Sequence, residues 1–271
     1  MLGFAKYAMK RLQVKLVYTL FLSVGVLFLS GILHFAAAQQ PVSYKLKVLE
    51  TLPHDRNAYT QGLFFHDGVL YESCGQYGQS HFRKSDLATG KVLRRLNFDP
   101  KYFVEGSCVL NNYLYILTWQ EHKCFIYDIR TLNYLGELPN FTEGWGLTTN
   151  GKELIMSDGT STLYTLDPMT FAVKSKVVVK LNGKPMMYLN ELEYINGEIW
   201  ANVYCTDTIL RIDPATGTVK GVVDCQNLLP RHLKTSTTDV LNGIAYNPAT
   251  KSLYLTGKNW PKMYKVEVVK K

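Results

Sequence analysis

The chain has 271 residues, 46% of them hydrophobic and 13% aromatic, which is enough for one large globular domain or two small ones. Its net charge is +8, but four basic side chains lie within the first fifteen residues, where there is no acid. The remainder contains no block of basic residues, so composition and charge argue against a nucleic-acid-binding protein.

The first 38 residues have the pattern of a targeting segment. Basic side chains come first, and residues 16–38 then run for 23 positions without Asp, Glu, Lys or Arg. The run ends in three alanines, small residues after which signal peptidase cuts, and this favours a cleaved signal peptide. The run is also long enough to span a bilayer as a retained anchor with its basic end in the cytoplasm. Under either alternative the rest of the chain is exported, to the exterior, the periplasm or the lumen of the secretory pathway.

The five cysteines show neither a Cys-x-x-Cys pair nor the His/Cys spacing of a zinc site, so we expect no metal ligands among them. In an exported protein their odd number leaves at least one thiol free or paired between chains. Small buried hydrophobic side chains are the simpler interpretation.

From residue 43 onward the chain is a succession of short strand-like segments. Runs rich in aromatic and β-branched residues alternate with turn signals such as Asp67-Gly68 and Asn111-Asn112. A polar residue, usually followed by glycine, precedes a pair of strands five times, at spacings of 44, 38, 47 and 52 residues. Repeats of about 40–50 residues with four strands each are typical of a β-propeller. The five polar residues are Gln61, Glu105, Glu143, Asn190 and Asn242.

The fifth repeat has only three strands, and the missing outer strand is available at residues 43–52, ahead of the first repeat. A ring closed in this way has no free sheet edges. We therefore predict an all-β, five-bladed β-propeller over residues 39–271, whose last blade is closed by an N-terminal strand.

The repeat places its five polar residues at one mouth of the central channel, because the first strand of each blade lines that channel. Large aromatic residues occur near the same register. Together they predict an apolar pocket with a few polar groups, the common form of a binding site. The alternative is that the polar residues are solvated at the mouth of the channel and that the aromatic residues only pack between blades, since fold alone implies no activity.

Ordered motifs in the chain resemble those of the plant-type (papaya latex type) glutaminyl-peptide cyclotransferases. They occur in family order from about residue 44 to residue 268 and include YTQGLFF, YFVEG, EGWGLTTNGKELIMSDG, LNELEY, LNGIAYN and TGKNWP. The resemblance implies a five-bladed propeller, in agreement with the repeat count. It also implies an acyltransferase that converts an N-terminal glutamine of peptides or proteins to pyroglutamate and releases ammonia.

The resemblance further implies roles for individual residues. The carboxylate of its EG motif is Glu105, and Lys258 and Asn190 match two further catalytic positions. The substrate-binding positions that it implies are Gln61, Tyr59, Phe103, Trp119, Trp145, Glu143 and Tyr204. Tyr59, Glu143 and Tyr204 stand where the family has Phe, Asp and Trp.

The implied reaction needs a group that takes a proton from the α-amine and returns one to the leaving nitrogen. A glutamate buried among aromatic rings has a raised pKa that suits both tasks. We expect no required cofactor and no catalytic metal. Backbone carbonyls could still hold a structural cation in the channel without leaving a trace in the sequence.

Two other functions stay open from the sequence. One is a non-catalytic propeller that binds peptides. The other is a calcium-dependent hydrolase of the lactonase type, whose oxygen ligands the polar residues of the repeat could imitate. For the cyclotransferase we expect peptide or protein substrates with N-terminal glutamine, a monomer, and membrane contact only through a retained anchor.

Overall fold

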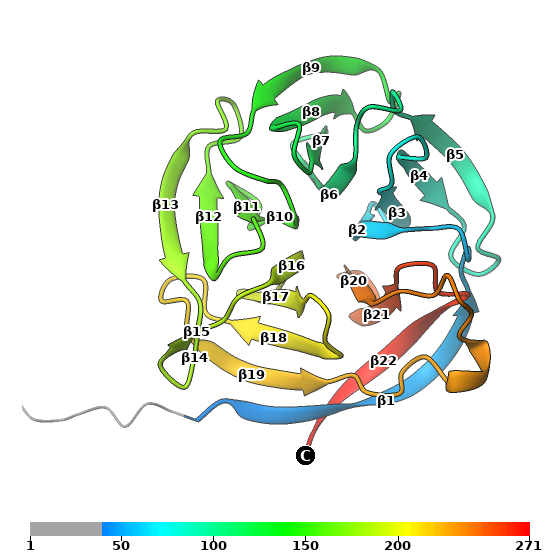
Figure 1. The fold of residues 1–271 in the computed structure, drawn as a ribbon, viewed down its shortest axis with the longest axis vertical. Coiled ribbons are helices and arrows are strands. Elements are labelled where there is room, and N and C mark those ends of the chain that lie inside the picture. The colour runs from blue at the N-terminus through cyan, green and yellow to red at the C-terminus, as the bar shows by residue number, and fades with distance from the viewer. Residues whose placement is uncertain (1–39) are drawn as a thin grey trace, which may run out of the picture. The chain divides into compact units, whose positions relative to one another are not determined.

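The structure, a computed structural model, describes residues 40–271, and the predicted targeting segment lies outside the described residues. These residues confirm the all-β class: their sheets surround a common centre (Figure 1). One turn of 3-10 helix, Arg231–Leu233, is the only helical element in this part of the chain. Within residues 40–271 no helix has the length and apolar character needed to cross a bilayer.

Three of the sheets contain four antiparallel strands each, in chain order, with the first strand nearest the centre (Figure 1). The first sheet comprises β2 (Thr60–His66), β3 (Val69–Cys74), β4 (His81–Ser85) and β5 (Val92–Asn97). The second comprises β6 (Val104–Leu110), β7 (Tyr113–Thr118), β8 (Lys123–Asp128) and β9 (Tyr134–Pro139). The third comprises β10 (Leu147–Thr149), β11 (Leu154–Ser157), β12 (Thr162–Leu166) and β13 (Val173–Val178), and the hairpin β14 (Lys180–Leu181) and β15 (Lys184–Pro185) follows it.

The remaining eight strands form one sheet in which the start of the described chain meets its end. Its order is β16 (Leu189–Ile195), β17 (Glu198–Val203), β18 (Thr208–Ile212), β19 (Val219–Asp224), β1 (Val42–Pro53), β22 (Lys262–Lys270), β21 (Ser252–Gly257) and β20 (Leu241–Asn247). β1 runs antiparallel to β22, from Tyr44 opposite Lys270 to Pro53 opposite Lys262, as the missing-strand argument predicted. β1 also pairs in parallel with β19, which was not predicted, and so joins two groups of strands.

Apolar cores lie between neighbouring sheets, because alternate side chains of each strand face the next sheet. Phe82 of β4, for example, belongs to the same core as Leu114 and Ile116 of β7, and all three are fully buried. The tight turns between strands need left-handed backbone. Asn111 and Asn112, predicted as a turn, have φ values of 52° and 66°, which match a two-residue hairpin turn.

Four of the inner strands carry a β-bulge at their first residues, and these bulges position the polar residues of the repeat. The pairing register shifts at the start of β2, β6, β16 and β20. A bulge inserts a residue and re-aims its side chain. Gln61, Glu105, Asn190 and Asn242 each lie inside one of these four bulges.

Glu143 does not occupy the fifth equivalent position, so that part of the predicted repeat is wrong. The third inner strand, β10, begins at Leu147 and pairs with β11 without a bulge. Glu143 therefore lies in the loop before the strand. Gly106 explains the glycine of the repeat: a Cβ there would lie 2.5 Å from the Leu147 nitrogen, so only glycine allows β6 to approach the next inner strand so closely.

Candidate active site

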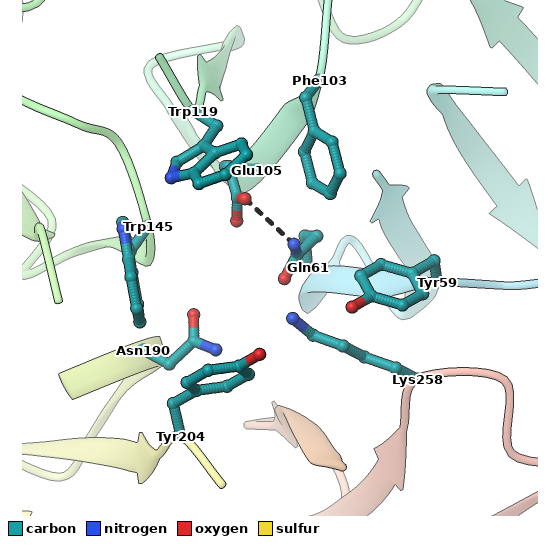
Figure 2. Close-up of a pocket in the computed structure, with 9 residues that line it drawn as sticks. All are labelled: Tyr59, Gln61, Phe103, Glu105, Trp119, Trp145, Asn190, Tyr204 and Lys258. Carbon is teal, nitrogen blue, oxygen red and sulfur yellow. Dashed lines mark hydrogen bonds between the residues drawn. The ribbon is translucent and has the colours of Figure 1, made fainter. Parts of the chain in front are cut away.

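A cavity of about 220 Å³ lies at the end of the inner strands that carries the bulges. Figure 2 shows its side chains converging from several sheets. Nine of the ten predicted site residues line it: Tyr59, Gln61, Phe103, Glu105, Trp119, Trp145, Asn190, Tyr204 and Lys258. The structure therefore brings together residues that are almost 200 positions apart in the chain.

Glu105 projects from the bulge of β6 and is only 5% exposed. Its Oε1 accepts a hydrogen bond from Gln61 Nε2 at 2.9 Å, while Oε2 accepts none from residues 40–271 (Figure 2). Burial raises the pKa of Glu105 well above its ordinary value; the charge of Lys258 lowers it in part, and that of Glu143 raises it further. A carboxyl group with a raised pKa and a free oxygen is suited to accept and then donate a proton.

The amide of Gln61 is oriented from behind by Asn242. Asn242 Nδ2 donates to the Thr60 carbonyl at 2.9 Å and to Gln61 Oε1 at 3.3 Å. With its oxygen held in this way, Gln61 turns its amino group toward Glu105. Asn242 is fully buried and does not line the cavity, so its contribution is to position Gln61.

Asn190 presents an uncommitted amide to the cavity. Its backbone oxygen accepts the Ser157 hydroxyl at 2.7 Å, but its side-chain Oδ1 is buried and has no hydrogen-bond partner among residues 40–271. Buried polar atoms in proteins are nearly always paired, so an unpaired oxygen that faces a cavity is available to accept a hydrogen bond from a ligand. Figure 2 shows this amide across the cavity from the Glu105 carboxyl group.

Lys258 is 3% exposed, and its ammonium lies between two tyrosine rings. The distances from Nζ to the ring centroids are 4.7 Å for Tyr59 and 5.2 Å for Tyr204, within the range of cation–π interactions. Burial lowers the pKa of Lys258, and the nearby Glu105 carboxyl group opposes this shift. The ammonium makes no hydrogen bond to a described residue, so its donors are available to a ligand.

Aromatic rings form the wall of the cavity. Phe103 packs edge-on against Tyr59 and Trp119, with centroid distances of 6.2 and 5.6 Å. On the opposite side Trp145 and Tyr204 meet at 5.6 Å in a T-shaped arrangement. Such contacts between rings add about 0.5–1.5 kcal/mol each beyond area burial, so the wall is held in place before a ligand binds.

Glu143 links the two halves of this wall but is not among the residues that line the cavity, and its substrate-binding role stays a prediction. Its Oε2 accepts hydrogen bonds from Trp119 Nε1 at 2.9 Å and from Trp145 Nε1 at 3.0 Å. Partial burial alone would raise the pKa of Glu143, but the two indole donors bring it below its ordinary value. Glu143 is therefore an ionised group that fixes both indoles.

Neither a metal cluster nor a disulfide is found in residues 40–271. No group of three or more His, Cys, Asp or Glu side chains there is placed to hold a metal ion. All five cysteines are free thiols; four are buried, and Cys205 is exposed beside Tyr204. Four of them thus fit the interpretation as small buried hydrophobic side chains.

Comparison with known proteins identifies the family. The sequence profile of the glutamine cyclotransferases matches residues 23–268. The chain belongs to the glutamine cyclotransferase family. Within it, a glutaminyl-peptide cyclotransferase of Arabidopsis thaliana is 44% identical over 228 residues, which cover 83% of this chain and 71% of that protein. The crystal structure of Myxococcus xanthus glutaminyl cyclase superposes with a TM-score of 0.80 at 35% identity, covering 86% of this chain and all of that one.

Sequence reasoning missed one residue beside the cavity of this family member. The Tyr59 hydroxyl donates to Asp239 Oδ2 at 2.9 Å. Burial and the Asp239 carboxylate raise the pKa of Tyr59, so the hydroxyl stays protonated and remains a donor. Asp239 lies 180 residues from Tyr59 in the loop before β20, outside every repeat position, and no pattern in the sequence pointed to it.

Proposed function

We propose that this protein is a glutaminyl-peptide cyclotransferase in which Glu105 moves the protons of the reaction. Family membership supports the reaction class. The observation that carries the mechanism is the buried carboxyl group of Glu105, which has a raised pKa and a free oxygen inside the aromatic wall. The substrates are peptides and proteins whose first residue is glutamine.

The reaction joins the substrate's α-amine nitrogen to the carbon of its own γ-amide. At neutral pH much of the amine is protonated, because its reference pKa is about 7.7–8.0. Glu105 takes a proton from the amine as the new C–N bond forms and gives a proton to the amide nitrogen as the old C–N bond breaks. Ammonia leaves and the ring of pyroglutamate remains. Proton transfer of this kind contributes typically about 10²–10⁴-fold in rate.

The tetrahedral intermediate carries a negative oxygen, and two groups are placed to stabilise it. The Nδ2 amino group of Asn190 and the ammonium of Lys258 face the cavity and donate no hydrogen bond to a described residue. Removing one such donor from an enzyme typically lowers its rate by about 10²–10³. Gln61 keeps the carboxyl group of Glu105 in position, and the rings of Phe103 and the two tryptophans pack around the apolar stem of the substrate.

The proposal extends to architecture and location. We count the eight-stranded sheet as two blades, β16 to β19 and β20 to β22 with β1, which gives a five-bladed propeller over residues 39–271. Residues 1–38 are a signal peptide or a signal anchor, and the enzyme is an exported monomer that contacts a membrane only through a retained anchor. Catalysis needs no cofactor, and a structural cation in the channel stays a prediction separate from the reaction.

An ammonia-release assay on the full chain tests this function against its two alternatives. The protein is incubated with a glutamine-initiated peptide, with and without a chelator of divalent cations, and a peptide that begins with alanine serves as control. We expect ammonia from the glutamine peptide alone, at the same rate in both conditions. Binding without ammonia release would support the non-catalytic propeller. In a parallel incubation with a lactone in place of the peptide, hydrolysis that the chelator abolishes would support the calcium-dependent hydrolase.

A further inference from the structure

A second cavity, of about 430 Å³, adjoins the active-site cavity and shares Tyr59 with it. We call it the polar groove. It is formed by the segment before β2, the turn after β3 and loops near β20 and β21, and its lining includes Asn57, Gly75, Gln76, Gln79, Asp239 and Asn259. We propose that the polar groove binds the backbone of the peptide chain that follows the substrate's N-terminal glutamine. This inference rests on the proposed function and names a site that the reaction itself does not require.

The size of the active-site cavity provides the first step. At about 220 Å³ it is smaller than the roughly 300–1,000 Å³ of pockets that enclose a drug-sized ligand, so it accommodates about one residue. Cyclisation requires both the α-amine and the γ-amide of the glutamine to reach Glu105. Only the α-carbonyl and the residues after it can therefore leave the cavity, and they need a surface to lie on.

The arrangement of the walls gives the direction of exit. On one side Trp119 and Trp145 are tied together through Glu143. On the other side the ring of Tyr59 is half-buried, and its hydroxyl is bonded to Asp239, which lines the polar groove. Tyr59 is thus the partition between the two cavities, and a chain that passes it enters the groove.

Gly75 shows how thin this partition is. The Gly75 nitrogen donates to the Tyr59 carbonyl at 2.9 Å, and a Cβ on Gly75 would lie 2.3 Å from the ring of Phe103. Backbone alone therefore separates the floor of the groove from the aromatic wall of the active site. An extended chain advances about 3.3–3.6 Å per residue, and because the two cavities share Tyr59, the groove would receive the residues that directly follow the glutamine.

The chemistry of the lining matches a peptide backbone. The side-chain amides of Asn57, Gln76 and Gln79 make no hydrogen bond to any residue in the described range 40–271. Each amide offers two donors and an acceptor, and a peptide backbone presents N–H and C=O groups to match them. Recognition through these groups does not depend on substrate side chains. Asn259, by contrast, is held by its bond to the Thr237 carbonyl at 2.9 Å and shapes the groove.

A substrate-length series tests the groove separately from the reaction. kcat/KM is measured on glutamine amide and on Gln-Ala-Ala-Ala, for the wild type, the double variant Asn57→Ala/Gln79→Ala and the control Gln226→Ala. Gln226 is an exposed amide that lines neither cavity. With hydrogen bonds worth about 0.5–1.5 kcal/mol each, we expect a roughly tenfold higher kcat/KM for the longer wild-type substrate, or about 1.4 kcal/mol.

The double variant should keep the wild-type value on glutamine amide and lose the tenfold gain, whereas the control should keep both. A tetrapeptide with N-methylated alanines should also lose the gain, while one with serine or leucine in place of alanine should keep it. A wild-type kcat/KM that is independent of length would refute the groove and leave the proposed function intact. An equal loss on both substrates in the double variant would also refute it, because it would indicate a structural role. No turnover of either substrate by the wild type would overturn both proposals.

Discussion

Replacing Glu105 by glutamine removes the proton acceptor with the least change in shape. An amide oxygen in place of Oε1 still accepts the hydrogen bond that Gln61 Nε2 now donates at 2.9 Å. In the variant, an amino group takes the place of Oε2, which accepts no hydrogen bond from residues 40–271. This amino group cannot take a proton. The variant should therefore bind substrate and fail in proton transfer.

The expected loss follows from the usual contribution of general acid–base catalysis. A factor of about 10²–10⁴ in kcat corresponds to about 3–5 kcal/mol at roughly 1.36 kcal/mol per factor of ten. KM should change little, because Glu105 acts on the transition state. The assay is steady-state ammonia release from a glutamine-initiated peptide, and the control is Glu267→Gln on β22, a half-exposed acid paired with Lys47.

Stability separates this interpretation from simple unfolding. Burial raises the pKa of Glu105 in the folded chain, so its contribution to stability is greatest at low pH and is lost as the pH rises through that pKa. A neutral glutamine avoids this loss, and the melting temperature of Glu105→Gln at neutral pH should equal or exceed that of the wild type. A folded variant whose kcat lies within tenfold of wild type would refute the proton-transfer role.

Three further substitutions test the electrostatics and the wall of the site. Lys258→Met removes a charge that lowers the pKa of Glu105. In a profile of kcat/KM against pH, measured on one peptide, the acid limb of this variant should therefore move to higher pH. Glu143→Gln removes a charge that raises the pKa of Glu105, so the acid limb should move to lower pH. If both variants moved the acid limb in the same direction, its assignment to Glu105 would be contradicted. Gly159 has φ +79°, and a Cβ there would lie 2.6 Å from the Trp145 ring. Gly159→Ala should cost about 1–2 kcal/mol in thermal or chemical denaturation and raise KM, and an unchanged KM would show that the indole position does not matter for binding.

The inner strands were predictable because two physical requirements leave a local trace in the sequence. The bulge turns a polar side chain toward the centre of the ring of sheets, and the close approach of the next inner strand requires glycine at the following position. These two requirements account for the pairs Gln61-Gly62 and Glu105-Gly106. Glu143-Gly144 has the same two residue types as Glu105-Gly106 but does not lie in a bulge. Its strand, β10, is short and has no bulge, so the glutamate stays in the loop.

Other features depend on contacts between distant segments and leave no local trace. The parallel pairing of β1 with β19 depends on which outer strands meet after the ring closes. The bond from Tyr59 to Asp239 depends on a loop that follows no repeat. The family motifs predicted which side chains meet in the pocket, but they did not predict that Glu143 would accept hydrogen bonds from the two indoles.

The most direct test of the central claim is the fate of nitrogen in a glutamine-initiated peptide labelled with ¹⁵N at its side-chain amide. The account predicts that mass spectrometry finds a product lighter by one labelled ammonia, with a blocked N-terminus and its α-nitrogen retained in the ring. A product in which glutamate has replaced glutamine, with a free α-amine, would indicate hydrolysis and contradict cyclisation. An unchanged peptide would contradict the catalytic function altogether.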